Sequence, residues 1–213
     1  MPISKPAQPI RVYGAELSGH THRVLLFLSL LGLPYEFIKV DLAAGAHKRP
    51  EFLAKNPFGQ VPVIEDGNVV LFDSNAILVY LATKYDDGAW LPRDPLGAAT
   101  VQRWMSLAAG HIFNGPAAAR MVTVFRAPLD HERAKTLSVA LFKVLDVELR
   151  GRQFALGKTP TLADVTAYAY IAHAPEGGVS LEPYPNIKAW LQHVEELPGF
   201  VPMPVSKAGL WAK

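Results

Sequence analysis

The sequence predicts an α/β domain built on a mixed four-stranded sheet, followed by an all-helical domain. Strand and helix patterns alternate over residues 10–40, and a hairpin pattern follows over residues 61–72. A turn-rich stretch then breaks the periodicity, and beyond it the strand signals vanish. We therefore expect four segments: a flexible tail at 1–9, an α/β domain at 10–86, a linker at 87–95 and a helical domain at 96–213.

The composition excludes several classes of function. The 213 residues suffice for two small domains with cores, and half of them are apolar, so the chain is not disordered. A net charge of +2 is too small to imply nucleic acid or an anionic membrane as the main partner. With no cysteine, the chain has no disulfide, thiolate metal site or cysteine nucleophile of its own. The longest apolar run is far too short to span a bilayer and the first residues lack a secretory signal, so we expect a cytoplasmic protein.

The first domain begins with a parallel pair of strands. Residues 10–13 alternate as a strand, and residues 35–40 form a second one. Between them, residues 21–31 form a helix that is apolar nearly all round, as expected beneath a sheet. A strand-helix-strand order of this kind gives parallel pairing.

A hairpin adds the antiparallel strands. Asp66-Gly67-Asn68 is a turn sequence between the β-branched and aromatic runs 61–64 and 69–72. Pro62 cannot donate to a ladder, so it lies at a strand beginning, where a cis Val61-Pro62 bond would make a fixed turn. The backbone N–H and C=O of Val61 would then be free to pair with an extended peptide ligand.

The residues after the hairpin combine a helix start with charge. Asp73-Ser74-Asn75 precedes an apolar helical run, and either Asp73 or Ser74 fits an N-cap. The same helix start could instead bind a carboxylate while the acid takes an ammonium group, as in a zwitterionic amino-acid head. Upstream, His47-Lys48-Arg49 is either a solvated basic run or a set of donors for a second carboxylate. Together these groups would hold a small charged peptide.

Three strings in the first domain resemble the cytosolic glutathione S-transferases, especially the serine-type phi-like group and its bacterial relatives. They are VYGAELSGHTHRVLLFL, AGAHKRPEFLAKNPFGQVPVIEDG and LFDSNAILVYL, and the resemblance covers about residues 10–86. It implies a thioredoxin-like first domain, glutathione as co-substrate without a metal, and conjugation of glutathione to hydrophobic electrophiles. It also implies a homodimer, in which Phe58 resembles the aromatic that anchors the partner in some members.

The resemblance assigns glutathione to seven residues: His47, Lys48, Gln60, Val61, Pro62, Asp73 and Ser74. The first two would bind the glycine carboxylate. Gln60 and Val61, beside the cis proline, would bind the peptide backbone, and the last two the γ-glutamyl head. The family usually has Glu-Ser or Gln-Ser at that last pair, so Asp73 is a shortened variant.

Ser18, at the mouth of the first helix, is the expected catalytic residue. Its hydroxyl can donate a hydrogen bond to a sulfur anion, and the helix N-terminus adds favourable partial charge. Both stabilise thiolate over thiol and make bound glutathione more nucleophilic. The alternative is a serine that only caps the helix.

Other side chains near Ser18 could take part in catalysis, but their sequence context favours structural roles. Tyr13 lies where tyrosine-type transferases carry their donor, but a tyrosine ending a strand is typical of packing. Thr21 is expected to cap or be buried, and Arg23 to be structural or at an interface. His20 and His22 could act at the entrance of the site, although isolated histidines are more often surface residues than ligands or bases.

The second domain is predicted from helix signals alone. Helical periodicity over residues 96–125 is interrupted at Asn114-Gly115-Pro116, where we expect a kink. Asp130 then caps a helix with an apolar stripe, and Thr161-Leu162-Ala163-Asp164 is a capping box in which Asp164 is structural rather than catalytic. The stripe consists of Ala134, Leu137, Leu141 and Leu145.

A last helix is expected over residues 185–197, and we expect the C-terminal segment with Phe200 and Trp211 to fold back on the helical domain. Several side chains of this domain could line an electrophile pocket, although such residues are more often core. They are Trp104, Met105, His111, Phe113 and Met121.

Two alternatives to conjugation remain open. A protein on the same fold could bind glutathione or a hydrophobic ligand without turnover, or it could be a peroxidase or disulfide reductase that uses the thiol of glutathione.

Overall fold

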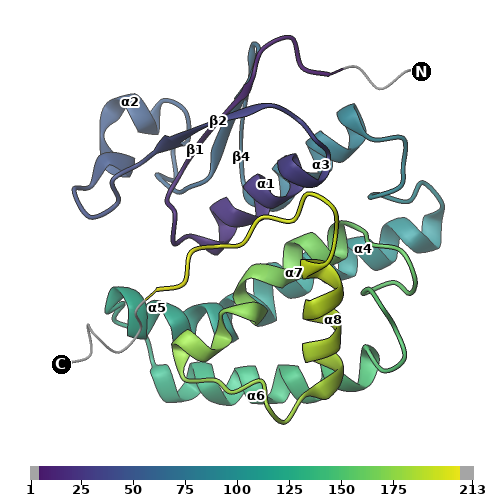
Figure 1. Ribbon diagram of the computed structural model, residues 1–213. Coiled ribbons are helices and arrows are strands. Elements are labelled where there is room, and N and C mark those ends of the chain that lie inside the picture. The colour runs from purple at the N-terminus through teal and green to yellow at the C-terminus, as the bar shows by residue number, and fades with distance from the viewer. Residues whose placement is uncertain (1–4, 207–213) are drawn as a thin grey trace. The chain divides into compact units, whose positions relative to one another are not determined.

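The computed structural model describes residues 5–206, which separate into two compact units (Figure 1). The first unit holds residues 5–91 together with 197–204, and the second holds residues 92–196 together with 205–206. Residues 86–94, between the last helix of the first unit and the first helix of the second, are irregular.

The first unit is built on a four-stranded sheet in the order β2-β1-β3-β4. Its strands are β1 (Ile10–Gly14), β2 (Tyr35–Lys39), β3 (Val63–Asp66) and β4 (Val69–Phe72). β1 pairs with β2 in parallel and with β3 antiparallel, and β3 and β4 form the hairpin. The mixed sheet expected from the sequence is confirmed.

Helices lie on both faces of this sheet. α1 (Gly19–Leu30) and α3 (Ser74–Tyr85) pack together, as Figure 1 shows. The short η1 (Ala46–Lys48) and α2 (Pro50–Leu53) follow β2, and Phe52 of α2 packs in a small core with Tyr13 and Val63. Because side chains alternate along β1, Tyr13 faces this small core while Val12, which is fully buried, faces the other side.

A buried carboxylate fixes α3 to the hairpin. Asp66 accepts hydrogen bonds from the hydroxyls of Tyr80 (2.8 Å) and Tyr85 (2.7 Å) and from the ammonium of Lys84 (2.7 Å). These three donors hold the pKa of Asp66 below its usual value, although burial acts in the opposite direction.

The segment 197–204 belongs to the first unit, which corrects the expectation that the chain end folds back on the helical domain. His22 of α1 bonds to the carbonyl of Val201 at 2.8 Å, and the hydroxyl of Ser29 donates to the carbonyl of Gly199 at 2.6 Å. Gly199 has φ +87°, and a Cβ there would lie 2.9 Å from the Ser29 carbonyl oxygen. Trp211 lies outside the described residues.

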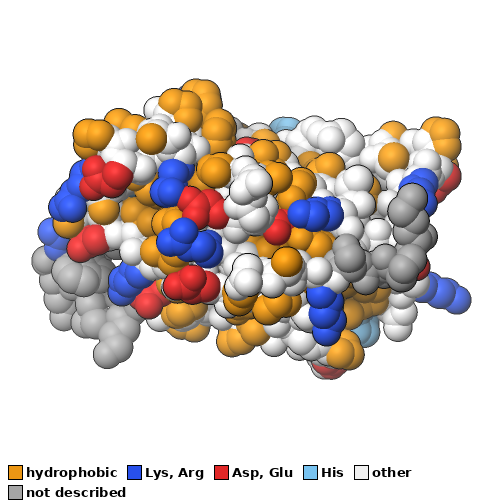
Figure 2. Space-filling view, turned by 90° about the horizontal axis from the view of Figure 1, so that it is seen from above, with side chains coloured by type: hydrophobic (Ala, Val, Ile, Leu, Met, Phe, Trp, Pro, Cys, Tyr) orange, Lys and Arg blue, Asp and Glu red, His pale blue; other side chains and the backbone are white. Residues whose placement is uncertain are grey.

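Basic and acidic side chains are intermixed on the face shown in Figure 2. Ion pairs of the first unit join Arg11 to Glu65 at 2.7 Å and Lys39 to Glu16 at 3.0 Å.

The second unit is helical throughout its described elements. They are α4 (Pro95–Leu107), η2 (Ala108–Ala117), α5 (Ala118–Phe125), α6 (His131–Glu148), α7 (Leu162–Ala172), η3 (Ala174–Gly177) and α8 (Pro185–Glu195). The predicted kink lies in η2, a wider helical segment that contains Pro116 and in which Gly115 has φ −97° and ψ −105°. Within residues 5–206, no helix has both the length and the apolar character needed to cross a membrane.

The predicted capping box opens α7. The Thr161 side chain accepts from a backbone N–H of the first turn, and Asp164 accepts from the Thr161 N–H at 2.8 Å. Asp164 is fully buried and also accepts from the Ala155 N–H (2.7 Å) and the Trp190 indole N–H (2.8 Å). It therefore links three segments of the helical unit.

The prediction that Leu137 belongs to the buried apolar stripe of α6 is wrong. Leu137 is 37% exposed, and the fully buried residue of this turn is Ser138. Gly115 of η2 packs so closely that a Cβ there would lie 3.2 Å from the Ser138 hydroxyl oxygen. This close approach requires a small side chain at position 138 of α6. The buried Ser138 hydroxyl is hydrogen-bonded, because it donates to the Ala134 carbonyl at 2.8 Å.

Candidate active site

The residues expected to bind glutathione emerge at one edge of the sheet. The parallel strands β1 and β2 end together, because Gly14 pairs with Lys39. β3 begins at the same edge, where Val63 pairs with Tyr13, and β4 ends there, where Phe72 pairs with Val63. The segments beyond these strand ends carry Ser18, His47, Lys48, Gln60, Val61, Pro62, Asp73 and Ser74.

Ser18 is the N-cap of α1. Its Oγ accepts a hydrogen bond from the Thr21 N–H at 3.3 Å, so the capping interpretation is correct. That bond uses a lone pair of the oxygen and leaves the hydroxyl proton, for which residues 5–206 offer no acceptor. Ser18 is half-buried, so a ligand atom can still reach it. Capping and donation to a ligand are therefore compatible.

The Tyr13 hydroxyl is hydrogen-bonded to a carboxylate and is not available to a ligand. It is 8% exposed, and its hydroxyl donates to Glu65 at 3.0 Å. Burial, with the Glu65 carboxylate as second cause, raises the pKa of Tyr13. A phenol bonded to a carboxylate in this way is a packed structural group, which favours Ser18 as the donor to sulfur.

Two loops meet where the glycine carboxylate is expected. The Lys48 ammonium donates to the carbonyls of Phe58 and Gly59, at 3.2 Å each. Gly59 has φ +60°, and a Cβ there would lie 2.7 Å from the His47 carbonyl oxygen, so only glycine fits. His47 is half-buried, and its Nδ1 is enclosed without a hydrogen-bond partner among residues 5–206. Gln60 has an exposed side chain, while its carbonyl accepts from the Asn56 amide at 2.8 Å.

The Val61-Pro62 peptide bond is cis. Val61 lies two residues before β3, outside the ladders that begin at Val63. Its backbone N–H and C=O are therefore outside the sheet pairing, as the sequence predicts for a residue that pairs with an extended ligand.

Asp73 caps α3 from an unusual backbone conformation. It is exposed, and its Oδ1 accepts from the N–H groups of Asn75 (3.0 Å) and Ala76 (2.9 Å). Its φ of +69° is disfavoured for a residue with a Cβ and costs of order 1–3 kcal/mol. Strain of this kind is concentrated at functional sites, and it orients the Asp73 carboxylate at the helix start.

Ser74 is buried, at 4% exposure, in a polar network that the sequence did not reveal. Its Oγ accepts from the Arg23 guanidinium at 2.8 Å and lies 3.0 Å from Nδ1 of His20. Arg23 also donates to the side-chain oxygen of Asn75 at 3.0 Å. Burial, with the positive charge of Arg23 second, lowers the pKa of His20 to about 3, so the imidazole is neutral.

The expectations for these α1 side chains are partly corrected. Arg23 is structural as expected and is 1% exposed. The histidines are not surface residues: His22 is 4% exposed, and His20 is half-buried against Ser74. The sequence did contain a signal for this polar network, because three basic residues within an otherwise apolar buried helix must find polar partners.

Comparison with known proteins decides the family. The glutathione S-transferase N-terminal domain profile matches residues 8–83, and the C-terminal domain profile matches residues 124–198. The chain belongs to the glutathione S-transferase family. All eight candidate residues of this glutathione S-transferase lie within the N-terminal match.

Relatives support the assignment over nearly the whole chain. Glutathione S-transferase F13 of Arabidopsis thaliana is 36% identical over 205 residues, covering 90% of this chain and 93% of the relative. Glutathione S-transferase 3 of Zea mays is 35% identical over 206 residues, covering 90% and 91%. A crystal structure of a glutathione S-transferase from Pseudomonas fluorescens has a TM-score of 0.87 at 33% identity, covering 93% of this chain and 100% of that one.

The side chains considered for an electrophile pocket divide by burial. Trp104 and Met105 of this glutathione S-transferase are 0% and 3% exposed, which is typical of core residues. Phe113 is 39% exposed, and His111 is also exposed, while Met121 is half-buried. The last three are the candidates that a ligand can reach.

Proposed function

We propose that this cytoplasmic protein binds glutathione along the sheet edge, stabilises its thiolate through Ser18, and adds the thiolate to hydrophobic electrophiles. One observation carries the proposal. The donor at the start of α1, the residue before a cis proline and the charged start of α3 all emerge at the same edge. An extended tripeptide needs this combination of a backbone partner in the middle and charged groups at both ends.

The chemistry assigned to Ser18 is a shift in the thiol equilibrium. Its hydroxyl donates to the sulfur, and the N-terminus of α1 adds positive partial charge. A cysteine-type thiol has a pKa of about 8.5 and is roughly 3% thiolate at pH 7. Lowering the pKa by about two units makes the thiolate the major form, which raises the concentration of the nucleophile more than twentyfold. The thiol proton is released to solvent. The thiolate then gives an electron pair to the electrophilic carbon, and the carbon–sulfur bond forms as a π bond at that carbon opens or a leaving group departs with its electron pair.

The binding roles follow from the charges. His47 and Lys48 bind the glycine carboxylate, while Gln60 and Val61, beside Pro62, bind the peptide backbone. At the other end the ligand carries a carboxylate and an ammonium group. We assign the ammonium to the Asp73 oxygen that does not cap α3.

Ser74 and the N-terminus of α3 take the γ-glutamyl carboxylate. The Arg23 guanidinium, bonded to the Ser74 hydroxyl oxygen, adds positive charge there and polarises the hydroxyl as a donor.

We also infer a homodimer with Phe58 as an anchor. Phe58 is 67% exposed, although its ring contacts Phe72 edge-to-face at 6.0 Å between centroids. Its backbone N–H is fixed by the Asn56 side chain at 3.0 Å. An exposed aromatic on a rigid loop is suited to insertion into a partner subunit.

The deciding experiment is a pH titration of the thiolate absorbance of bound glutathione. We expect the wild type to lower the thiol pKa and Ser18→Ala to restore it towards about 8.5. Tyr13→Phe is the matched control, because it removes a hydroxyl that faces Glu65, and it should leave the thiol pKa at the wild-type value.

Two results would contradict the proposal in different ways. If Tyr13→Phe rather than Ser18→Ala restored the pKa, the catalytic assignment would be wrong. If the wild type bound glutathione without lowering the pKa, the protein would bind glutathione without activating it.

A further inference from the structure

Thr21 lies in the first turn of α1, directly after the short loop 15–18 that joins β1 to α1 and carries Ser18. The residue is 0% exposed, which confirms the expectation that it is buried. Thr21 has no part in the glutathione contacts proposed above. Its side chain and its backbone nevertheless make specific contacts with both ends of the loop.

The Thr21 hydroxyl holds the beginning of the loop. Its oxygen accepts a hydrogen bond from the Ala15 N–H at 3.2 Å. Ala15 directly follows Gly14, the last residue of β1. Gly14 is itself fixed at the sheet edge, because its carbonyl accepts from the Val40 N–H at 2.7 Å. Thr21 therefore sets the direction in which the loop leaves the sheet.

The Thr21 methyl group interlocks with Gly14. A Cβ at Gly14 would lie 2.2 Å from Cγ2 of Thr21, far inside the normal separation of two carbon atoms. The φ of Gly14 lies outside the left-handed region, so a glycine is needed here for space rather than for backbone conformation. This close approach holds the start of α1 against the end of β1.

The backbone of Thr21 holds the other end of the loop. Its N–H donates to Ser18 Oγ at 3.3 Å. Within the loop, the Ser18 N–H donates to the Ala15 carbonyl at 3.0 Å and closes a turn. Ala15 and Ser18 are thus bonded to each other and each to Thr21. A serine oxygen that accepts from a fixed N–H is restricted in its χ1 rotamer, and the directions open to its proton are restricted with it.

These contacts set the position of the Ser18 hydroxyl relative to the sheet edge. Val61, the proposed backbone partner of glutathione, lies at the same edge, before the start of β3. The path from the sheet edge to Ser18 therefore decides whether the hydroxyl meets the sulfur. A hydrogen bond weakens steeply when its angle falls below about 120°, and a displacement of about 1 Å can slow a reaction about a hundredfold.

We propose that Thr21 is a positioning residue for the transferase reaction. Its side chain fixes the loop 15–18 so that the Ser18 hydroxyl donates to the glutathione sulfur. This role rests on the proposed function of Ser18 and deepens it. Because Thr21 is fully buried, it acts through Ser18 and not on glutathione directly.

The test measures the thiol pKa of bound glutathione from its thiolate absorbance, and the glutathione dissociation constant by calorimetry. Thr21→Val keeps the shape and a methyl group but removes the acceptor for the Ala15 N–H. Thr21→Ser keeps the acceptor and removes the methyl group. Thr21→Ala also lacks the acceptor, and it replaces the valine variant if that variant does not fold.

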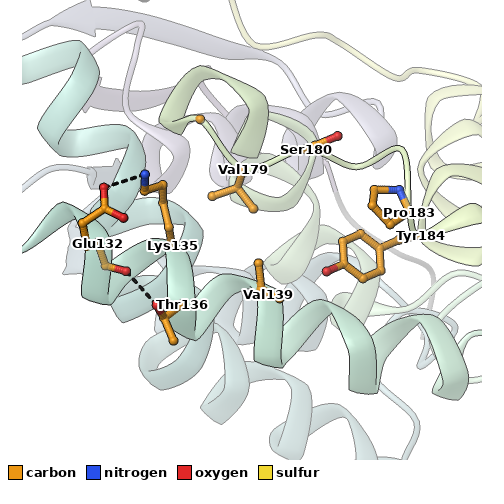
Figure 3. Close-up of a pocket in the computed structure, with 9 residues that line it drawn as sticks. Glu132, Lys135, Thr136, Val139, Val179, Ser180, Pro183 and Tyr184 are labelled. Carbon is orange, nitrogen blue, oxygen red and sulfur yellow. Dashed lines mark hydrogen bonds and ion pairs between the residues drawn. The ribbon is translucent and has the colours of Figure 1, made fainter.

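Two controls change buried residues outside the loop. Leu28→Val alters a fully buried residue in the second half of α1. Val179→Ala alters a residue of the helical unit that is 3% exposed and lines the depression between α6 and residues 178–184 (Figure 3). Urea midpoints of all variants show how much a loss of stability alone changes the thiol pKa.

We expect Thr21→Val to raise the thiol pKa, with a fall of about tenfold in the ionisation constant, the size of a weakened hydrogen bond to a charged group. The dissociation constant near pH 5.5, where the thiol is protonated, should change less than about twofold, because other residues bind the charged ends of the peptide. Thr21→Ser should restore nearly the wild-type pKa, and both controls should retain it.

Two further measurements separate positioning from a general structural effect. In the Ser18→Ala background, Thr21→Val should have no further effect on the pKa, because residues that act through one bond are not additive. Amide hydrogen exchange at Ala15 and Ser18 should be faster in Thr21→Val than in the wild type, because the loop loses one of its attachments.

Several results would overturn the positioning role. They are a wild-type thiol pKa or unchanged exchange at Ala15 in Thr21→Val, a further rise of the pKa when Thr21→Val is added to Ser18→Ala, and an equal rise in either control. Failure of the proposed function would look different. The wild type and Ser18→Ala would then have the same thiol pKa, and the role of Thr21 would be overturned with that of Ser18.

Discussion

Replacing Asp164 by Asn tests a fully buried carboxylate of the helical unit that accepts hydrogen bonds from three residues. Oδ1 of Asp164 accepts from the Ala155 N–H at 2.7 Å and from the Trp190 indole N–H at 2.8 Å, while Oδ2 accepts from the Thr161 N–H at 2.8 Å. An asparagine has nearly the same shape but only one acceptor oxygen. The favoured orientation keeps that oxygen where two donors converge, so the new amide group faces the N–H of Thr161.

The expected loss of stability follows from the number of acceptor oxygens that remain. One buried donor loses its acceptor and meets another donor, which costs about 1–3 kcal/mol of the free energy of unfolding. Loss of the capping box is the same event and is not added. For a domain whose total stability is roughly 5–15 kcal/mol, this decrease is easily measured.

Asp130→Asn is the matched control. Asp130 is an exposed N-cap whose Oδ1 accepts from the Arg133 N–H at 2.9 Å. Asn caps helices about as well as Asp, so this variant should differ from the wild type by less than about 0.5 kcal/mol.

Urea unfolding, followed by tryptophan fluorescence and circular dichroism, gives the comparison. We expect a lower midpoint for Asp164→Asn with an unchanged slope. Equal stabilities of the two variants would refute the reasoning, because an exposed cap and a buried carboxylate with several donors would then contribute alike.

Two further predictions concern the first unit. Ser74→Ala should weaken glutathione binding by about 1–3 kcal/mol, because the γ-glutamyl carboxylate loses a donor; an unchanged dissociation constant by calorimetry would leave Ser74 as a partner of Arg23 and His20 only. Phe58→Ser should shift the protein from dimer towards monomer in sedimentation equilibrium, because an exposed aromatic anchor is lost; a dimer of unchanged strength would show that the interface lies elsewhere.

Features set by neighbouring residues could be predicted from the sequence. The hairpin turn depends on Gly67, which has φ +59°, and the capping box depends on two residues three positions apart. The sequence offered two adjacent residues, Asp73 and Ser74, as the N-cap of α3, and Asp73 makes the capping hydrogen bonds. Each of these signals is complete within a few positions of the chain.

Features that depend on distant residues could not be predicted. The Arg23–Ser74 hydrogen bond joins residues 51 positions apart, and the bond from His22 to Val201 spans 179. Periodicity places Leu137 in the buried stripe, but the close approach of Gly115 makes Ser138 the buried residue.

The return of residues 197–204 to the first unit has a consequence for biosynthesis. The ribosome delivers the N-terminal strands and α1 first, and domains generally begin to fold as they emerge. The residues that bond to His22 and Ser29 arrive only after residues 92–196 of the helical unit have been made. Until then α1 lacks part of its cover, so a nascent chain stalled before Val201 would hold an incomplete first unit. Translation order therefore makes completion of the first unit a late event.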